Sequence, residues 1–379
     1  MMLGGFTQRS LQSGLLLVGL ILTFSVHSQE HGDHGHGASH HHHDDHGHEP
    51  FEAGSFITNH IADAHDIHLF GDVHIPLPII LHVEGMGWKF FMSSAFEGHG
   101  HGDKKMKLGK TGKLVLWGEH PEEGRNPGEI TAFDGRGTEL EVFDASITKS
   151  VFGLFLVLTL MLLLFRSAAK SYERRPGQAP TGLANFLEPL IIFLRDDVAR
   201  PSIGKEADRF MPFLLTIFFF ILFSNLLGLV PFIGGFNITG TLGVTIVLAT
   251  LVFLITNFSG NKHYWGHILW MPGVPVPIKV LILTPIEIIS VFMKPLVLMI
   301  RLTANITAGH IIILAFTSLV FIFGKSGEAP VAGVGIGIFS TAFMIFMYFL
   351  ELLVAFLQAY VFTLLAALYF GDARQEAHH

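Results

Sequence analysis

The sequence predicts an all-α polytopic membrane protein with about five membrane-inserted helices and one amphipathic surface helix, preceded by an N-terminal extracytoplasmic β-rich extension. Half of the 379 residues are hydrophobic, only 15% are charged, and the mean hydropathy is +0.50. The charged residues concentrate before residue 150 and between 166 and 209, which leaves long apolar tracts afterwards. A helix needs about 20 apolar residues to cross a bilayer, so these tracts are candidate spans. The absence of cysteine excludes disulfides, thiolate chemistry and cysteine zinc sites.

The first 49 residues predict an export signal and then a disordered tract. Arg9 precedes a short apolar run, Gly14–Phe24, and small residues follow at a cleavage position, so residues 1–28 are expected to be a signal peptide. An uncleaved anchor helix is the alternative. Residues 29–49 are polar and cannot pack a core. Imidazole suits zinc, nickel and copper, but without regular ligand spacing we favour a weakly chelating tail. Its weak candidate ligands are His40, His41, His42 and His43.

Residues 50–145 predict a small β-rich segment outside the membrane. Runs rich in β-branched, aromatic and aliphatic residues are separated by glycine-containing turn signals, the pattern expected of short strands. The runs are Leu77–Val83, Trp88–Met92, Lys113–Trp117 and Leu140–Phe143. Nothing in this segment indicates catalysis.

The membrane domain is expected over residues 146–372, followed by a cytoplasmic tail, 373–379. Its first three spans are Ile147–Phe165, Met211–Phe232 and Ile238–Phe258, and Ser259–Pro277 is a loop. Arg166 and further basic residues follow the first span, which places that end in the cytoplasm by the positive-inside rule. Between the first two spans, residues 181–200 have apolar positions at helical spacing and predict an amphipathic helix on the cytoplasmic face.

The last two apolar tracts are unusually long. Ile278–Phe323 has 46 residues and Gly335–Phe370 has 36, whereas a perpendicular span needs about 20. As helices they would be about 69 and 54 Å long, so they must be steeply tilted. Pro285 and Pro295 are candidate kinks in the first. The hairpin turn is expected at Lys325–Pro330 together with Gly333, Gly335 and Gly337.

One arginine, Arg301, lies deep in the first long tract. A charge at bilayer depth costs at least about 3 kcal/mol, so it usually has a function. Four more polar residues fall within about 40° of it on a helical projection: Glu287, Ser290, Lys294 and Asn305. A snorkelling arginine or a structural ion pair is the alternative, but snorkelling does not explain a polar stripe of five residues.

The second long tract has a polar face of its own. Tyr348, Glu351 and Gln358 lie on one side of a helix. An antiparallel partner can place Glu351 and Gln358 opposite His310 and Asn305. A Glu/His pair at membrane depth suits a proton relay, because histidine titrates near neutrality. A static pair that locks the hairpin is the alternative.

These motifs resemble subunit a of the membrane sector of bacterial F-type ATP synthase, over roughly residues 145–372. The specific pattern is Arg301-Leu-x-x-Asn305-x-x-Ala308-Gly309, with Lys294-Pro295 before it and a late Glu351 and Gln358. Supporting matches are Phe165-Arg166-Ser-x-Ala-Lys170, Ser224-Asn225-Leu-Leu-Gly-Leu-Val-Pro231 and Thr239-Gly-Thr241. Some members of the family carry Glu in place of His310 and His in place of Glu351. This exchange suggests that the two positions face each other.

The resemblance implies a non-catalytic, proton-translocating stator subunit with two offset half-channels beside a rotating ring of c subunits. The outer half-channel would contain Asn305, His310, Glu351 and Gln358. The inner one would contain Glu287, Ser290 and Lys294, and Arg301 would separate the two. The implied partners are the c-ring, the subunit b peripheral stalk, the other synthase subunits, the lipid bilayer and protons.

The implied location is the bacterial cell inner membrane, with the mature N-terminus outside and the C-terminus in the cytoplasm. No cofactor and no nucleic acid are expected, and the sequence has no phosphate-binding glycine loop. A metal-ion secondary transporter is the alternative function, suggested by the histidines. It should show paired repeats with interrupted helices, which we do not find. A scaffold whose charges only join helices is a further alternative.

Overall fold

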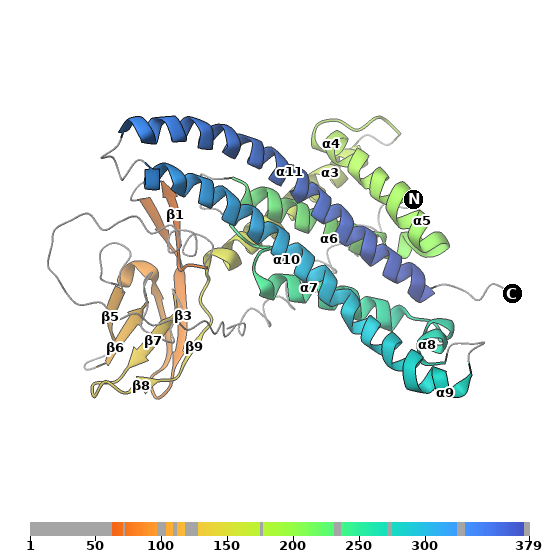
Figure 1. Ribbon diagram of the computed structural model, residues 1–379, viewed down its shortest axis with the longest axis horizontal. Coiled ribbons are helices and arrows are strands. Elements are labelled where there is room, and N and C mark those ends of the chain that lie inside the picture. The colour runs from red at the N-terminus through yellow and green to blue at the C-terminus, as the bar shows by residue number, and fades with distance from the viewer. Residues whose placement is uncertain are drawn as a thin grey trace.

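The computed structural model describes residues 63–70, 73–96, 104–108, 112–117, 128–174, 177–230, 236–270, 275–323 and 330–374. The predicted signal peptide and histidine tract, residues 1–49, therefore lie outside the described residues, as does the tail beyond Arg374. The chain has a β region followed by a bundle of long helices (Figure 1). This arrangement confirms the predicted fold class.

The described residues of the β region form three antiparallel sheets. They are the hairpin β1-β2, a three-stranded sheet in the order β4-β3-β9, and a four-stranded sheet in the order β5-β6-β7-β8. The last two pack face to face, because Ile79, Leu81 and Val83 of β3 share one buried cluster with Leu114 of β6 and Ile130 of β7. The strands are β1 (Asp66–Phe70), β2 (Val73–Pro76), β3 (Pro78–Val83), β4 (Gly87–Met92), β5 (Lys104–Leu108), β6 (Gly112–Leu116), β7 (Ile130–Phe133), β8 (Glu139–Leu140) and β9 (Val142–Asp144).

The β region is attached directly to the first membrane helix, α3 (Lys149–Arg174), which begins four residues after β9. The amide of Ile147 donates to the carbonyl of Pro78 at 3.1 Å, and the amide of Lys149 donates to that of Ala64 at 2.8 Å. The Ser150 amide donates to Oδ1 of Asp63 at 2.9 Å, which satisfies a free N–H at the helix start. These bonds hold the sheet against the end of the span.

In the described part of the chain, five helices are long and apolar enough to cross a membrane. They cover Lys149–Arg174, Leu183–Gly228, Leu242–Ser259, Val276–Leu319 and Gly337–Arg374. The remaining bounds are α4 (Leu183–Phe193), a π-helical stretch Leu194–Ala199, α5 (Arg200–Ile203), α6 (Ala207–Gly228), α7 (Leu242–Ser259), α8 (Lys262–Leu269), α9 (Val276–Ile278), α10 (Thr284–Phe323) and α11 (Pro330–Arg374).

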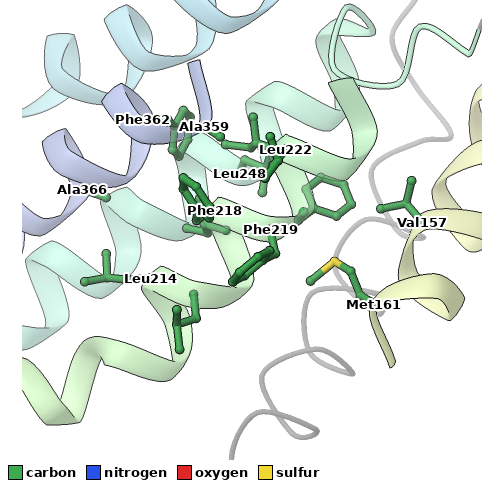
Figure 2. Packing of buried hydrophobic residues seen from close by; sticks show 14 of the residues in the cluster. Val157, Met161, Leu214, Phe218, Phe219, Leu222, Leu248, Ala359, Phe362 and Ala366 are labelled. Carbon is green, nitrogen blue, oxygen red and sulfur yellow. The ribbon is translucent and has the colours of Figure 1, made fainter. Parts of the chain in front are cut away.

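Helix α6 lies at the centre of the helical bundle. Figure 2 shows its Phe218 and Phe219 among side chains of three other helices, including Met161 of α3, Leu248 of α7 and Phe362 of α11. Both phenylalanines are completely buried. Because α6 is predominantly apolar on all sides, it can be enclosed by its neighbours. It packs directly against α11, whereas α10 packs against α7 and α11.

Helices α10 and α11 run side by side along much of the molecule (Figure 1). Their lengths of 40 and 45 residues confirm the prediction of two exceptional helices. Pro295 lies inside α10. Proline lacks an N–H to donate, and the five residues Lys279–Leu283 shortly before Pro285 form π-helical turns instead of α-helical ones.

Several boundaries differ from those expected. Helix α3 continues beyond Phe165 to Arg174, since arginine and lysine are good helix formers once the chain leaves the apolar layer. The expected loop Ser259–Pro277 contains helix α8, which is capped by the Asn261 side chain accepting from the Tyr264 amide at 2.8 Å.

Two further boundaries were wrong at the last helix. Gly333, Gly335 and Gly337 lie within α11 and not in the hairpin turn. At the other end α11 continues to Arg374, two residues past Asp372, because the guanidinium of Arg374 pairs with the carboxylate of Glu206.

The segment predicted as an amphipathic surface helix is helical throughout residues 183–203. Leu187 and Leu194 are buried against the bundle, while Phe186 on another side is 67% exposed. Its apolar side chains therefore occupy more than one face. The position of this helix at the cytoplasmic surface stays a prediction.

Candidate functional site on the long helical hairpin

Arg301 lies on the outward face of α10. Leu298, Leu302 and Ile306 pack inward, each at most 4% exposed, so the helical period turns Arg301 and Asn305 away from the bundle. In the part of the chain that the structure describes, Arg301 has no hydrogen bond or ion pair. Arg301 is flanked by the apolar side chains of Val297 and Ile300, which are 40% and 51% exposed, on a face that also carries the exposed Asn305.

Glu351 of α11 faces His310 of α10, as the antiparallel arrangement predicted. Oε1 of Glu351 lies 3.0 Å from Nδ1 of His310, and the two side chains are 5% and 19% exposed. The contact lacks hydrogen-bond alignment, because both Glu351 oxygens are buried without a hydrogen-bond partner. The same Nδ1 lies 3.2 Å from the carbonyl oxygen of Ile306, one turn earlier. A small rotation of the imidazole would move its Nδ1 between the carbonyl and the carboxylate.

A glycine makes room for the Glu351 carboxylate. A Cβ atom on Gly309 would lie 2.8 Å from Oε1 of Glu351 and 3.1 Å from its Cδ. Such contacts are closer than carbon atoms tolerate, so the approach of α10 and α11 at this level depends on the missing side chain. The absence of a side chain at Gly309 therefore determines how closely the Glu351 carboxylate approaches α10.

Further polar groups are buried on α6, on α11 and in the turn before α7. The amide nitrogen of Asn225 on α6 donates to the Ala355 carbonyl of α11 at 3.2 Å. The hydroxyl of Thr239 donates to the Asn225 side-chain oxygen at 2.6 Å. Ser224 is 1% exposed, and its hydroxyl has no partner. Gln358, two turns beyond Glu351, is 6% exposed, so this face of α11 is polar and enclosed.

The second predicted set lies nearer the start of α10. Nζ of Lys294 is 3.7 Å from Oδ2 of Asp372, near the end of α11, and 5.1 Å from the ring centre of Tyr369. Lys294 and Tyr369 line one small hollow with Thr256 and Asn257 of α7. Ser290 and Glu287 lie one and two turns before Lys294 and are half-buried.

The predicted residues thus form two groups, one on each side of Arg301 along α10. Toward the end of α10 are the His310–Glu351 pair and the enclosed Gln358. Toward its start is the Lys294–Asp372 pair. Asn305 is exposed beside Arg301 and has no described contact with Gln358. The arrangement offers two polar regions separated by one exposed, unpaired cation.

Comparison with known proteins identifies this architecture. The family described as ATP synthase A chain matches residues 151–371. The chain belongs to the ATP synthase A chain family. A subunit a from Chloroherpeton thalassium is 43% identical over 244 residues, which cover 64% of this chain and 70% of the relative. A subunit a from Myxococcus xanthus is 40% identical over 62% of this chain and 75% of its own. Residues 56–146 match a family described only as a domain of unknown function.

Members of the ATP synthase A chain family are proton-translocating stator subunits of F-type ATP synthase, and this chain shares that function. It is a multi-pass membrane protein that works with other subunits of the membrane sector. In the described part of this subunit, no group of three or more His, Asp or Glu side chains is arranged to hold a metal ion. The weak candidates His40–His43 lie outside the described residues.

Sequence reasoning missed four residues of this subunit's site. Asn225 and Thr239 were recognised as motif positions but were given no role, although both are buried polar residues, one on α6 and the other in the turn before α7. Gly309 was noted only as part of a pattern. Asp372 carried a usable signal, since it is an acid at the end of a long apolar helix, but its partner Lys294 lies 78 residues away.

Proposed function

We propose that the two polar groups are the two half-channels of this stator subunit and that Arg301 separates them. The outer half-channel contains Asn305, His310, Glu351 and Gln358. The inner half-channel contains Glu287, Ser290 and Lys294, to which we add Asp372. The observation that carries this assignment is Arg301 itself, an exposed cation without an ion-pair partner among the described residues, which lies on α10 between the two groups.

His310 and Glu351 suit proton uptake because one proton shared between them leaves no uncompensated charge on the buried carboxylate. A buried carboxylate without hydrogen bonds is unfavourable unless it is protonated or faces a cation. The pair has two states, and Glu351 meets one of these conditions in each. In the first, Glu351 is protonated; in the second, it is ionised and faces the His310 imidazolium 3.0 Å away. Passing the proton between them therefore leaves the total charge of the pair unchanged.

Arg301 is proposed to meet the ionised carboxylate of each c subunit as the ring turns. Its guanidinium stays protonated under all physiological conditions and can pair with a carboxylate through two N–H groups. An exposed arginine in lipid would be costly, so a partner surface bearing carboxylates explains its position. The exposed apolar residues beside it, Val297 and Ile300, would contact the ring.

The direction of proton flow follows from the proposed orientation. The β region lies outside the cytoplasm, the end of α11 lies in the cytoplasm, and the protein resides in the bacterial inner membrane. Protons enter by the His310 side, travel with the ring and leave by the Lys294 side. One charge crossing 100 mV releases about 2.3 kcal/mol, so several protons are needed per ATP. The subunit b peripheral stalk holds the chain stationary.

The test is substitution of Arg301 in inverted membrane vesicles, with ATP synthesis and passive proton leak as the two measurements. Arg301→Ala should abolish synthesis and increase the leak. Arg301→Lys should abolish synthesis almost as fully, because a lysine lacks the planar pair of donors. Arg174→Ala, at the exposed end of α3, is the matched control and should synthesise ATP normally. Near-normal synthesis by Arg301→Lys would refute the assignment.

A further inference from the structure

The β region carries a cluster of exposed apolar side chains that proton transport does not use. We call it the aromatic face; it consists of His82, Trp88, Phe90, Met92 and Phe143. Trp88 is 53% exposed, Phe90 70%, Met92 43% and Phe143 42%. Their rings are mutually ordered: the centre of Trp88 lies 6.4 Å from that of Phe90 in a stacked arrangement and 6.4 Å from that of Phe143 edge-on. His82 meets Trp88 at 5.1 Å.

This face is unusual for its sheet. In an antiparallel sheet with one face on a core, the other face is normally polar and solvated. Here the inner face of β3 contains Ile79, Leu81 and Val83, which are completely buried against the second sheet. The outer face nevertheless carries the exposed apolar side chains of Trp88, Phe90, Met92 and Phe143. A concentrated exposed apolar patch of this kind marks a contact surface.

The aromatic face belongs to the sheet that lies nearer the helical part of the protein. Because the second sheet covers the inner face of β3, the aromatic face points away from that sheet. Figure 1 shows β5 and β6 on the far side of the β region, and β3 and β9 on the side nearer the helices. Strand β9, which carries Phe143, leads within four residues into α3. The bond from Ile147 to Pro78 holds the end of the sheet at the point where α3 begins.

We propose that the aromatic face rests on the lipid bilayer, at the boundary between head groups and acyl chains of the leaflet in which α3 begins. Tryptophan is enriched at this depth because its ring is apolar and its N–H is polar. Phe90 and Met92 supply apolar surface that inserts among acyl chains. The aromatic face lies close to the start of a membrane span, and this favours lipid over a soluble partner. The bilayer surface is always present beside α3, whether or not another protein is bound. The proposal depends on α3 being a span and does not depend on the proton path.

The experiment uses the complete synthase reconstituted in phosphatidylcholine vesicles. The chain has no natural cysteine, so Phe90→Cys gives this chain a single site for an environment-sensitive fluorophore, and the signal of the unsubstituted synthase treated in the same way is subtracted. Met92→Cys is a second position on the same face, in case the first perturbs the fold. Lys107→Cys is the control, because Lys107 is exposed on β5 of the other sheet. Each probe is challenged with lipids carrying a nitroxide near the head group and with aqueous iodide.

The expected result is a loss of fluorescence with nitroxide lipid, and little with iodide, at positions 90 and 92, and the reverse at position 107. Quenching at positions 90 and 92 by iodide alone would show a solvent-exposed face and overturn the proposal. Protection from both quenchers would show that a neighbouring protein covers the face, which also overturns it. ATP synthesis is recorded on the same vesicles. The synthesis rate tests the proposed proton path and the quenching tests the proposed membrane contact, so failure of one proposal is distinguished from failure of the other.

Discussion

Replacing Gly309 with alanine tests the site at its tightest point. The added methyl carbon would lie 2.8 Å from Oε1 of Glu351. An ordinary contact begins near 3.4 Å, so the carboxylate must withdraw by about 0.6 Å or the two helices must separate. A shift of this size away from His310 would lengthen the 3.0 Å approach to about 3.6 Å, beyond hydrogen-bond distance.

The size of the effect follows from overpacking. Forcing one methyl group into a well-packed contact costs about 1–3 kcal/mol. If this free energy is added to the barrier for proton transfer between His310 and Glu351, the rate of proton-driven ATP synthesis should fall about 5- to 150-fold. Glu351→Asp in the same chain shortens the acid by one methylene and should recover part of the loss, because the carboxylate then withdraws from the new methyl.

The assay is ATP synthesis in inverted vesicles, normalised to the amount of assembled complex on native gels. Gly266→Ala is the matched control, since its Cβ would meet nothing within 4 Å and alanine favours the helix. Normal synthesis by Gly309→Ala would refute the placement of Glu351. A loss explained entirely by reduced assembly would mean that the contact is only structural.

Three other predictions concern separate parts of the chain. The double exchange His310→Glu with Glu351→His should synthesise ATP faster than either single alanine variant, and simple additivity in a double-mutant cycle would show that the two side chains do not interact. Deleting His31 to His48 while keeping the signal should leave proton-driven synthesis near normal in metal-replete medium; intact complexes with little proton flux would contradict this. Burial opposes ionisation of Asp144, but its hydrogen bonds to His65 and Ser146 lower its pKa overall. The stability that this carboxylate contributes is therefore present above the ordinary aspartate pKa of about 4 and is lost as pH falls through the lower folded value. Asp144→Asn should accordingly speed hydrogen exchange in β9 at pH 7 more than at pH 3.

The sequence by itself determined the class of protein and the residues most worth testing. The lengths of the apolar segments and the positions of the charges can be taken from the sequence alone, and they largely determine which segments cross a bilayer. The polar stripe that contains Arg301 and the face shared by Glu351 and Gln358 follow from helical period alone. The opposition of His310 and Glu351 could also be predicted, because an antiparallel partner can place the two side chains opposite each other and the two residue types are exchanged in some members of the family.

Only the tertiary structure decided what depends on close approach between distant segments. That Gly309 admits the Glu351 carboxylate, and that Asp372 meets Lys294, could not be read from local pattern. The same holds for the end of α11, which Glu206 sets by pairing with Arg374 from 168 residues away. It also holds for the aromatic face, because strand alternation shows that two faces exist but not which one the second sheet will cover. The periodicity of side chains is a property of a single helix or strand. A contact between two such elements depends on their relative placement, which is set by the packing of the whole chain.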